Sequence, residues 1–286
     1  MSKKNQRTKD ILKQAKPEEI NAAVDDYFSR EPLLIPRLKN WEEDLPENNA
    51  KQSVPGKLIQ VTEINDTWME IPRYENIMWG GAWFSVFTSI IPVIALVWVN
   101  IKSYYFGFDI YIFMVSILFL FFLFSMILLS LRMALFVPRD QPIRFNRKRQ
   151  KIYIFEHHRK AWNPWVKWPT TIRVYDWADV HGEISRESDR YDQGFRLYGA
   201  VCQPGTRNVT ERFILNRAVF YIEHQRQLWS HWCQYMQHQP VVKDPLYPSQ
   251  HDDGRPRKRK VFWPEALDIE SRTAPEYPKS DDPESH

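Results

Sequence analysis

The sequence predicts an α+β membrane protein in which a two-helix transmembrane hairpin precedes a cytoplasmic domain of short antiparallel strands closed by a C-terminal helix. Three observations lead to this prediction. Two long apolar stretches without charge lie at residues 77–99 and 110–131, short strand-like runs follow from residue 143 onward, and a helical pattern begins at Asn216. A run of strands followed by a helix is typical of the α+β class.

The chain accordingly divides into four parts. Residues 1–76 form a polar cytoplasmic segment, residues 77–131 the transmembrane hairpin, residues 132–240 the cytoplasmic α+β domain, and residues 241–286 a Pro-rich tail. The low apolar content of the tail predicts that it is largely disordered. FWPEALDI, at residues 262–269, is a candidate for a short segment that docks back on the domain.

The two apolar stretches have the length and composition of membrane-spanning helices. IMWGGAWFSVFTSIIPVIALVWV covers residues 77–99 and IYIFMVSILFLFFLFSMILLSL covers residues 110–131, and neither contains a charged residue. Each has about 22 residues, which is enough for a helix to cross the hydrocarbon core of a bilayer. Buried core helices of a soluble protein are the alternative, but they rarely run so long without a charge.

The distribution of charge around these stretches predicts their orientation. The connection NIKSYYFGFD, residues 100–109, is so short that the two helices must form a hairpin. Lys and Arg gather after the second stretch, from Arg132 onward, whereas the connection holds one Lys. Because cytoplasmic segments carry the excess of Lys and Arg, we expect both termini in the cytoplasm. The first residues, MSKKNQRTKDILKQAKPEE, lack the apolar core of a signal peptide.

A basic stretch, RFNRKRQKIY, follows the second apolar stretch and begins at Arg144. We interpret it as a β-hairpin with strands at residues 143–145 and 151–155 and a polar tip between them, since Asn146 suits a turn. Because the tip follows the second span closely, we expect it at the cytoplasmic leaflet, where each basic residue near anionic lipid contributes about 1 kcal/mol. The residues predicted to contact the membrane surface are Arg144, Arg147, Lys148, Arg149 and Lys151.

Further strand-like runs predict the rest of the domain. They are KLIQVTEI before the spans and TTIRVYDW, ADVHGEI, FRLYGAVC and TERFIL after them. The last helix is expected to begin with Asn216 as its N-cap and to end at Pro240. Another helix is predicted at residues 17–29. A small bent sheet closed by a C-terminal helix resembles the pleckstrin-homology architecture, and bacterial membrane proteins carry such domains after two spans.

No catalytic site, metal site or cofactor is predicted, and we expect that the protein is not an enzyme. The chain has 9 Gly and no phosphate-binding loop, and its 2 Cys form no disulfide framework or zinc motif. Three His residues recur every seventh position, too far apart on a helix to share a metal, so we expect a solvated stripe: His224, His231 and His238. A cluster that begins at Asp176 could hold a metal or act in acid–base catalysis, but turns at a strand end explain it better: Asp176, Asp179, His181 and Glu183.

Three tryptophans lie close together and are candidates for binding a partner: Trp162, Trp165 and Trp168. They could line a groove, and core packing or contact with the bilayer explains them equally well. The net charge of +4 is modest, and the chain carries no recognition helix, zinc finger or aromatic RNA-binding signature. We therefore expect no nucleic-acid partner.

Three segments carry a family resemblance: PIRFNRKRQKIYIF, YDWADVHGEI and LWSHWCQYMQ. Together they resemble an uncharacterised group of proteobacterial two-span membrane proteins that are often encoded beside type VI secretion effectors. The resemblance covers about residues 60–240. It implies an immunity or accessory protein of the bacterial inner membrane that binds a cognate effector toxin stoichiometrically. The alternative hypothesis is a pleckstrin-homology-like membrane adaptor that binds anionic lipid or a protein partner.

Overall fold

The computed structural model describes residues 29–73, 79–107, 109–138, 140–160, 163, 165–188, 193–247 and 261–275. The helix predicted at residues 17–29 lies outside this part of the chain except for Ser29, and Trp162 also lies outside it.

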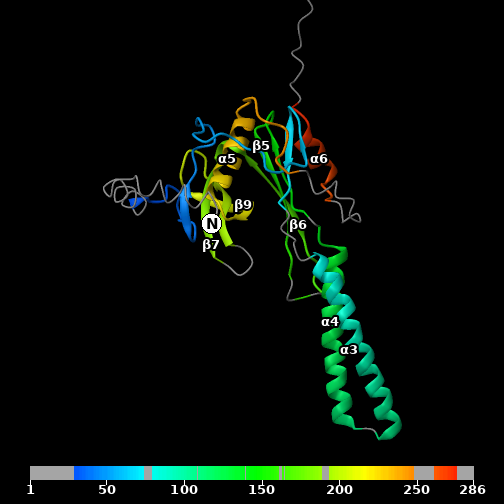
Figure 1. The fold of residues 1–286 in the computed structure, drawn as a ribbon. Coiled ribbons are helices and arrows are strands. Elements are labelled where there is room, and N and C mark those ends of the chain that lie inside the picture. The colour runs from blue at the N-terminus through cyan, green and yellow to red at the C-terminus, as the bar shows by residue number, and fades with distance from the viewer. Residues whose placement is uncertain are drawn as a thin grey trace, which may run out of the picture.

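Two long apolar helices form a hairpin that projects from the rest of the molecule (Figure 1). They are α3 (Trp79–Phe106) and α4 (Ile110–Leu135), and both are long and apolar enough to cross a membrane. Asp109 caps α4, because its carboxylate accepts hydrogen bonds from the backbone N–H groups of Tyr111 and Ile112. The helices also contact each other through polar groups, since the Ser116 hydroxyl donates to Asn100 Oδ1 at 2.7 Å. The two predicted apolar helices are therefore confirmed.

Two antiparallel sheets form the larger part of the molecule. The first has the order β2-β3-β4-β5-β6 and the second the order β1-β7-β8-β9. The strands of the first sheet are β2 (Glu63–Ile64), β3 (Trp68–Ile71), β4 (Ile143–Asn146), β5 (Lys151–His157) and β6 (Thr170–Asp176). The strands of the second are β1 (Trp41–Asp44), β7 (Val180–Ser188), β8 (Gln193–Cys202) and β9 (Val209–Val219).

The helical hairpin is inserted between two neighbouring strands of the first sheet. The chain leaves the sheet after β3, passes through α3 and α4, and returns as β4, which pairs with β3 from Trp68 opposite Asn146 to Ile71 opposite Ile143. The ends of the helical hairpin are thereby tied to the sheet through a continuous antiparallel ladder. This pairing requires residues far apart in the sequence and could not be predicted from the local pattern.

The core lies where helix α5 (Ile222–Met236) packs against both sheets. Trp229 and Trp232 are fully buried. The ring of Trp232 lies 5.4 Å from that of Phe145 on β4, and the ring of Trp229 lies 5.4 Å from that of Trp177, which follows β6. Buried aromatic side chains of this size contribute a large share of core stability. The helix therefore closes the sheets, as predicted for an α+β domain.

The start of this helix differs from the prediction. Asn216 lies in β9, which continues to Val219 because it pairs with β8, and the helix begins only at Ile222 after Tyr221. The Asn216 amide donates to Gln225 Oε1 at 2.9 Å instead of capping the helix. Pairing with a neighbouring strand satisfies the backbone of these residues, and this tertiary contact overrides the local N-cap signal.

The basic β-hairpin is confirmed. Strands β4 and β5 pair in register from Ile143 opposite Ile154 to Asn146 opposite Lys151. The Asn146 side chain stabilises the tip, because its Oδ1 accepts hydrogen bonds from the backbone N–H groups of Lys148 and Arg149. A short helix from the tail, α6 (Glu265–Arg272), packs beside this hairpin (Figure 1). The tail is therefore ordered over this part, and the proposed docking of residues 262–269 is confirmed.

Candidate functional site

The tip of the basic β-hairpin points away from α3 and α4 (Figure 1). Strand β5 starts at Lys151 beside the tip and ends at His157. These six steps along a strand separate its two ends by about 20 Å. The opposite end of β5 and the start of β6 lie beside the end of α4. The expectation that the tip lies close to the end of the second span was wrong, because β4 carries the chain away from the helices.

Arg144 is buried beneath α6 and cannot contact a membrane surface. Its side chain is 1% exposed. Its guanidinium donates to Glu70 and to Asp268 of α6, both at 2.6 Å. It also lies over the ring of Trp263 at 4.2 Å and over that of Trp68 at 5.2 Å. The assignment of Arg144 as a lipid contact was therefore wrong, since two ion pairs and two aromatic rings enclose it.

Other residues of the hairpin also bind the tail. The Asn146 amide donates to the backbone carbonyl of Thr273 at 2.8 Å and so caps the C-terminus of α6. Arg149 donates to the same carbonyl at 2.9 Å, and the Tyr153 hydroxyl donates to the Glu270 carboxylate at 2.9 Å. Burial and the Glu270 carboxylate raise the pKa of Tyr153. This face of the sheet thus recognises an acidic helix of the same chain.

The remaining basic residues of the hairpin differ from one another in exposure. Arg147 is buried and lies 4.8 Å from the centre of the Tyr235 ring. Lys151 is partly exposed and lies 3.8 Å from the Glu270 carboxylate. Lys148 is exposed. The structure therefore does not bring the five predicted residues together as one surface patch.

Two of the predicted tryptophans lie beside α4, Trp165 near its middle and Trp168 near its end. They belong to the segment between β5 and β6, which includes residues 158–169. The ring of Trp165 lies 6.2 Å from that of Phe124 in the middle of α4. Arg132, in the last turn of α4, lies over the Trp168 ring at 5.1 Å and donates to the Val166 carbonyl at 2.9 Å. This segment is thereby fixed to the side of the helix.

A pocket of about 500 Å³ opens at this junction, and we call it the α4 pocket. Arg132 and Lys167 supply basic groups to its wall, and none of the lining residues that the structure describes is Asp or Glu. Its lining residues are Arg132, Phe136, Pro138, Phe155, His157, Lys167, Trp168, Pro169, Thr170 and Phe262. Sequence analysis did not select Arg132 or Lys167 as site residues. The sequence signal that could have identified them was a basic residue at the end of an apolar helix together with a tryptophan cluster later in the chain.

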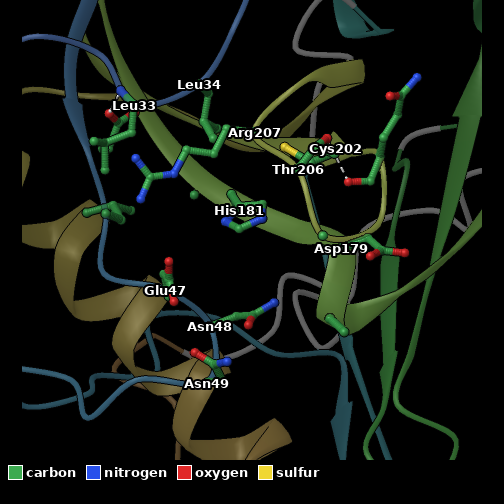
Figure 2. Close-up of a pocket in the computed structure, with 16 residues that line it drawn as sticks. Leu33, Leu34, Glu47, Asn48, Asn49, Asp179, His181, Cys202, Thr206 and Arg207 are labelled. Atoms are coloured by element: carbon green, nitrogen blue, oxygen red, sulfur yellow. Dashed lines mark hydrogen bonds between the residues drawn. The ribbon is translucent and has the colours of Figure 1, made fainter.

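A second pocket, of about 310 Å³, lies between β7, the segment around β1 and the β8–β9 turn (Figure 2). Figure 2 shows His181 near its centre, with Asp179 on one side and Glu47 and Arg207 on the other. Burial lowers the pKa of His181. Burial raises the pKa of the Cys202 thiol in the same wall, which makes it a poor nucleophile. These groups form a polar cleft with no activated nucleophile among its described residues.

The acidic cluster of the sequence is separated by the fold. Asp179 and His181 line the second pocket, whereas Glu183, on the same face of β7 as His181, lies outside this pocket and is paired with Arg212 at 2.7 Å. Asp176 is exposed at the end of β6. Within the described residues, no group of three or more His, Cys, Asp or Glu side chains could hold a metal ion.

The expectation of a solvated histidine stripe was wrong for His231. Its side chain is buried, and Nε2 lies 2.9 Å from the Val242 carbonyl, so this nitrogen carries the proton. Burial lowers the pKa of His231. His224 and His238 are exposed, as expected. The segment after α5 folds back over the helix and covers only the middle histidine.

Together these features define an α+β protein with two membrane-length apolar helices and a basic, tryptophan-containing pocket at the end of the second. A family model described as a family of unknown function (DUF6708) matches residues 119–262, half of the chain, and the chain belongs to this family. The matched segment contains every residue that lines the α4 pocket. Neither a curated protein nor a solved structure matches the chain.

Proposed function

We propose that the protein is a membrane-anchored binding protein whose α+β domain is held against the cytoplasmic surface of the membrane. In this proposal α3 and α4 span the bilayer, and the segment between β5 and β6 enters the bilayer from its surface, with Trp168 at the headgroup level and Trp165 below it. The contact of Trp165 with Phe124 of α4 is the observation that carries the proposal. It places an amphipathic aromatic ring, 57% exposed, beside the apolar part of the helix. Trp and Tyr are enriched towards the ends of membrane spans, where the bilayer meets water.

The spacing of aromatic and basic residues along the helices supports this placement. Exposed tyrosines lie at the connected ends of α3 and α4, and Lys102 lies over the Trp98 ring at 4.6 Å near the same end. From Tyr111 to Arg132 the helix α4 rises about 32 Å. This length matches the hydrocarbon core of a bilayer, which is about 30 Å thick. Arg132 and Trp168 would then lie at the level of the lipid headgroups.

The order of the elements supports a pleckstrin-homology-like adaptor. Strands β3 to β6 are four consecutive antiparallel neighbours, β7 to β9 are three more in the second sheet, and α5 closes both. Four strands, three strands and a C-terminal helix are the order that the pleckstrin-homology architecture requires. On this proposal the membrane hairpin is an insertion between its first two strands. The domain would act as a scaffold that binds lipid or protein without turnover.

A cognate effector toxin is the protein partner that we propose from the resemblance to proteins encoded beside type VI secretion effectors. One structural observation favours a partner on the domain side. The connection from α3 to α4 spans only Gly107 to Asp109, so it offers little surface on the other side of a membrane. An immunity protein of this shape would meet its toxin in the cytoplasm or within the bilayer of the bacterial inner membrane.

Site-specific labelling of the full chain tests the membrane arrangement. Tyr104→Cys introduces a thiol near the connection of the helices, and Lys148→Cys introduces one at the exposed tip of the basic hairpin; the two native thiols are buried. In bacterial cells whose outer membrane has been permeabilised and whose inner membrane is intact, an impermeant maleimide should label Tyr104→Cys. Lys148→Cys should react only after the inner membrane is permeabilised. Labelling of Lys148→Cys while the inner membrane is intact would exclude the proposed orientation.

Co-expression tests the toxin partner separately. The full chain is expressed with a candidate effector toxin from a neighbouring gene, and cell survival and co-purification are measured. Survival with a stable complex is expected for immunity by binding. Cell death with both proteins well expressed would contradict the immunity role and leave the lipid-binding adaptor as the function.

A further inference from the structure

We propose that the α4 pocket binds the headgroup of an anionic phospholipid, with Arg132, Lys167 and the Trp168 indole as its polar contacts. This inference rests on the proposed membrane anchoring and identifies the ligand of the domain at the membrane surface. The group that these contacts would bind is a negatively charged phosphate. The apolar part of the pocket wall favours a phospholipid over a free phosphate ion as the source of this group.

The described residues of the pocket wall include two basic side chains. Arg132 and Lys167 line the pocket, and none of its described lining residues is Asp or Glu. Lys167 is exposed and makes no ion pair within the part of the chain that the structure describes. Arg132 is held in place by its hydrogen bond to the Val166 carbonyl and its contact with the Trp168 ring. A fixed guanidinium with an adjacent lysine is suited to a phosphate group.

The indole of Trp168 supplies a donor that lacks an acceptor. The residue is 7% exposed, and its Nε1–H has no hydrogen-bond partner among the described residues. A buried indole N–H usually finds a partner. Trp168 lines the same pocket as the two cations, and its Nε1–H is buried behind the pocket surface. A phosphate oxygen in the pocket would satisfy this donor and pair with the positive charges at once.

The other part of the wall is apolar and open. Phe136 at the end of α4 is 53% exposed and Phe262 is 69% exposed, and Pro138 lies between α4 and the sheet. A free phosphate ion would gain nothing from these side chains, whereas the glycerol and first acyl carbons of a phospholipid would cover them. The position of Arg132 in the last turn of α4 places the basic groups where headgroup phosphates lie in the proposed bilayer arrangement. The combination therefore fits a phospholipid better than a soluble anion.

Native mass spectrometry of the detergent-solubilised full chain tests the inference. The protein is titrated with phosphatidylglycerol, with phosphatidylcholine as the zwitterionic comparison, and the retained lipid is counted. We expect saturable binding of one phosphatidylglycerol at least about tenfold tighter than phosphatidylcholine, since one charged hydrogen bond accounts for about that factor. Equal binding of the two lipids would overturn the inference.

Three variants locate the site. Lys167→Ala removes one cation, and Trp168→Phe removes the N–H but keeps an aromatic ring beside Arg132. Each should weaken phosphatidylglycerol binding about tenfold. Lys148→Ala removes the same charge at the tip of the basic hairpin and should change nothing, because this tip lies at the other end of the sheet. Equal weakening by Lys148→Ala and Lys167→Ala would indicate diffuse charge attraction and overturn the site.

A competition arm distinguishes the two sources of phosphate. Inorganic phosphate at millimolar concentration should not displace phosphatidylglycerol, because it cannot use the apolar wall. Displacement would identify a soluble anion site and contradict the lipid assignment. The maleimide labelling described above reports membrane orientation independently of lipid headgroup. A correct labelling pattern without phosphatidylglycerol preference would therefore refute this inference alone, whereas a wrong pattern would refute the proposed function.

Discussion

Replacing Arg144 by methionine should release α6 and destabilise the domain. The arginine joins β4, β3 and α6 because it donates to Glu70, Asp268 and the Ser271 hydroxyl at distances of 2.6 to 2.8 Å. Methionine keeps most of the length and the apolar contact with Trp263, so the substitution removes charge and hydrogen bonds more than volume. The two carboxylates lose their common partner.

The magnitude follows from the burial of these partners. Removing one member of a buried ion pair costs about 3–5 kcal/mol, because the remaining charge stays desolvated. The Glu70 side chain is 13% exposed, whereas that of Asp268 is 34% exposed and can be solvated by water. We therefore expect a loss near the lower bound, about 3 kcal/mol. Such a loss is a large fraction of the roughly 5–15 kcal/mol that stabilises an ordinary domain.

Urea unfolding of the full chain in detergent micelles measures this loss, and hydrogen exchange of residues 265–272 measures the release of α6. Lys148→Met is the matched control, since that residue is basic, exposed and two positions beyond Asn146. Its unfolding free energy should stay within about 0.5 kcal/mol of the parent. Adding Glu70→Gln and Asp268→Asn to Arg144→Met should recover part of the loss, because neither carboxylate is then left without its arginine partner. Parent-like stability and unchanged exchange in Arg144→Met would refute the reasoning.

Three further predictions concern the core. Gly199→Ala would place a Cβ 2.4 Å from the Phe213 ring and should lower the free energy of unfolding in urea by about 1–3 kcal/mol. A urea midpoint equal to that of the parent would contradict the clash. Burial lowers the pKa of His231, so its stabilising effect is present above the unfolded pKa of about 6.5 and is lost as pH falls below that value towards the lowered folded pKa. His231→Gln should therefore flatten the decline of stability below pH ~6.5, while the exposed His224→Gln should leave it unchanged. Burial raises the pKa of the Cys233 thiol, so a water-soluble maleimide should label it in urea and not in the native chain.

The apolar helices and the turn of the basic hairpin are features that the sequence alone determined. A long uncharged stretch is helical in an apolar environment whatever surrounds it, because only a helix satisfies its backbone internally. The Asn146 side chain likewise bonds to backbone N–H groups two and three residues later. Both outcomes depend on neighbouring residues, so local patterns were sufficient to predict them.

The surroundings of the basic residues were decided only by the tertiary structure. Arg144 finds its acidic partner Asp268 at a sequence separation of 124 residues, and Arg132 meets the Val166 carbonyl at a separation of 34. The short motif around a basic residue does not indicate which distant groups will contact that residue in the folded protein. The direction of β4 depends on pairing with β3 across the inserted helices. The same positive charge therefore became an internal ion pair at Arg144 and part of an open pocket at Arg132, because packing decides whether a charge is desolvated.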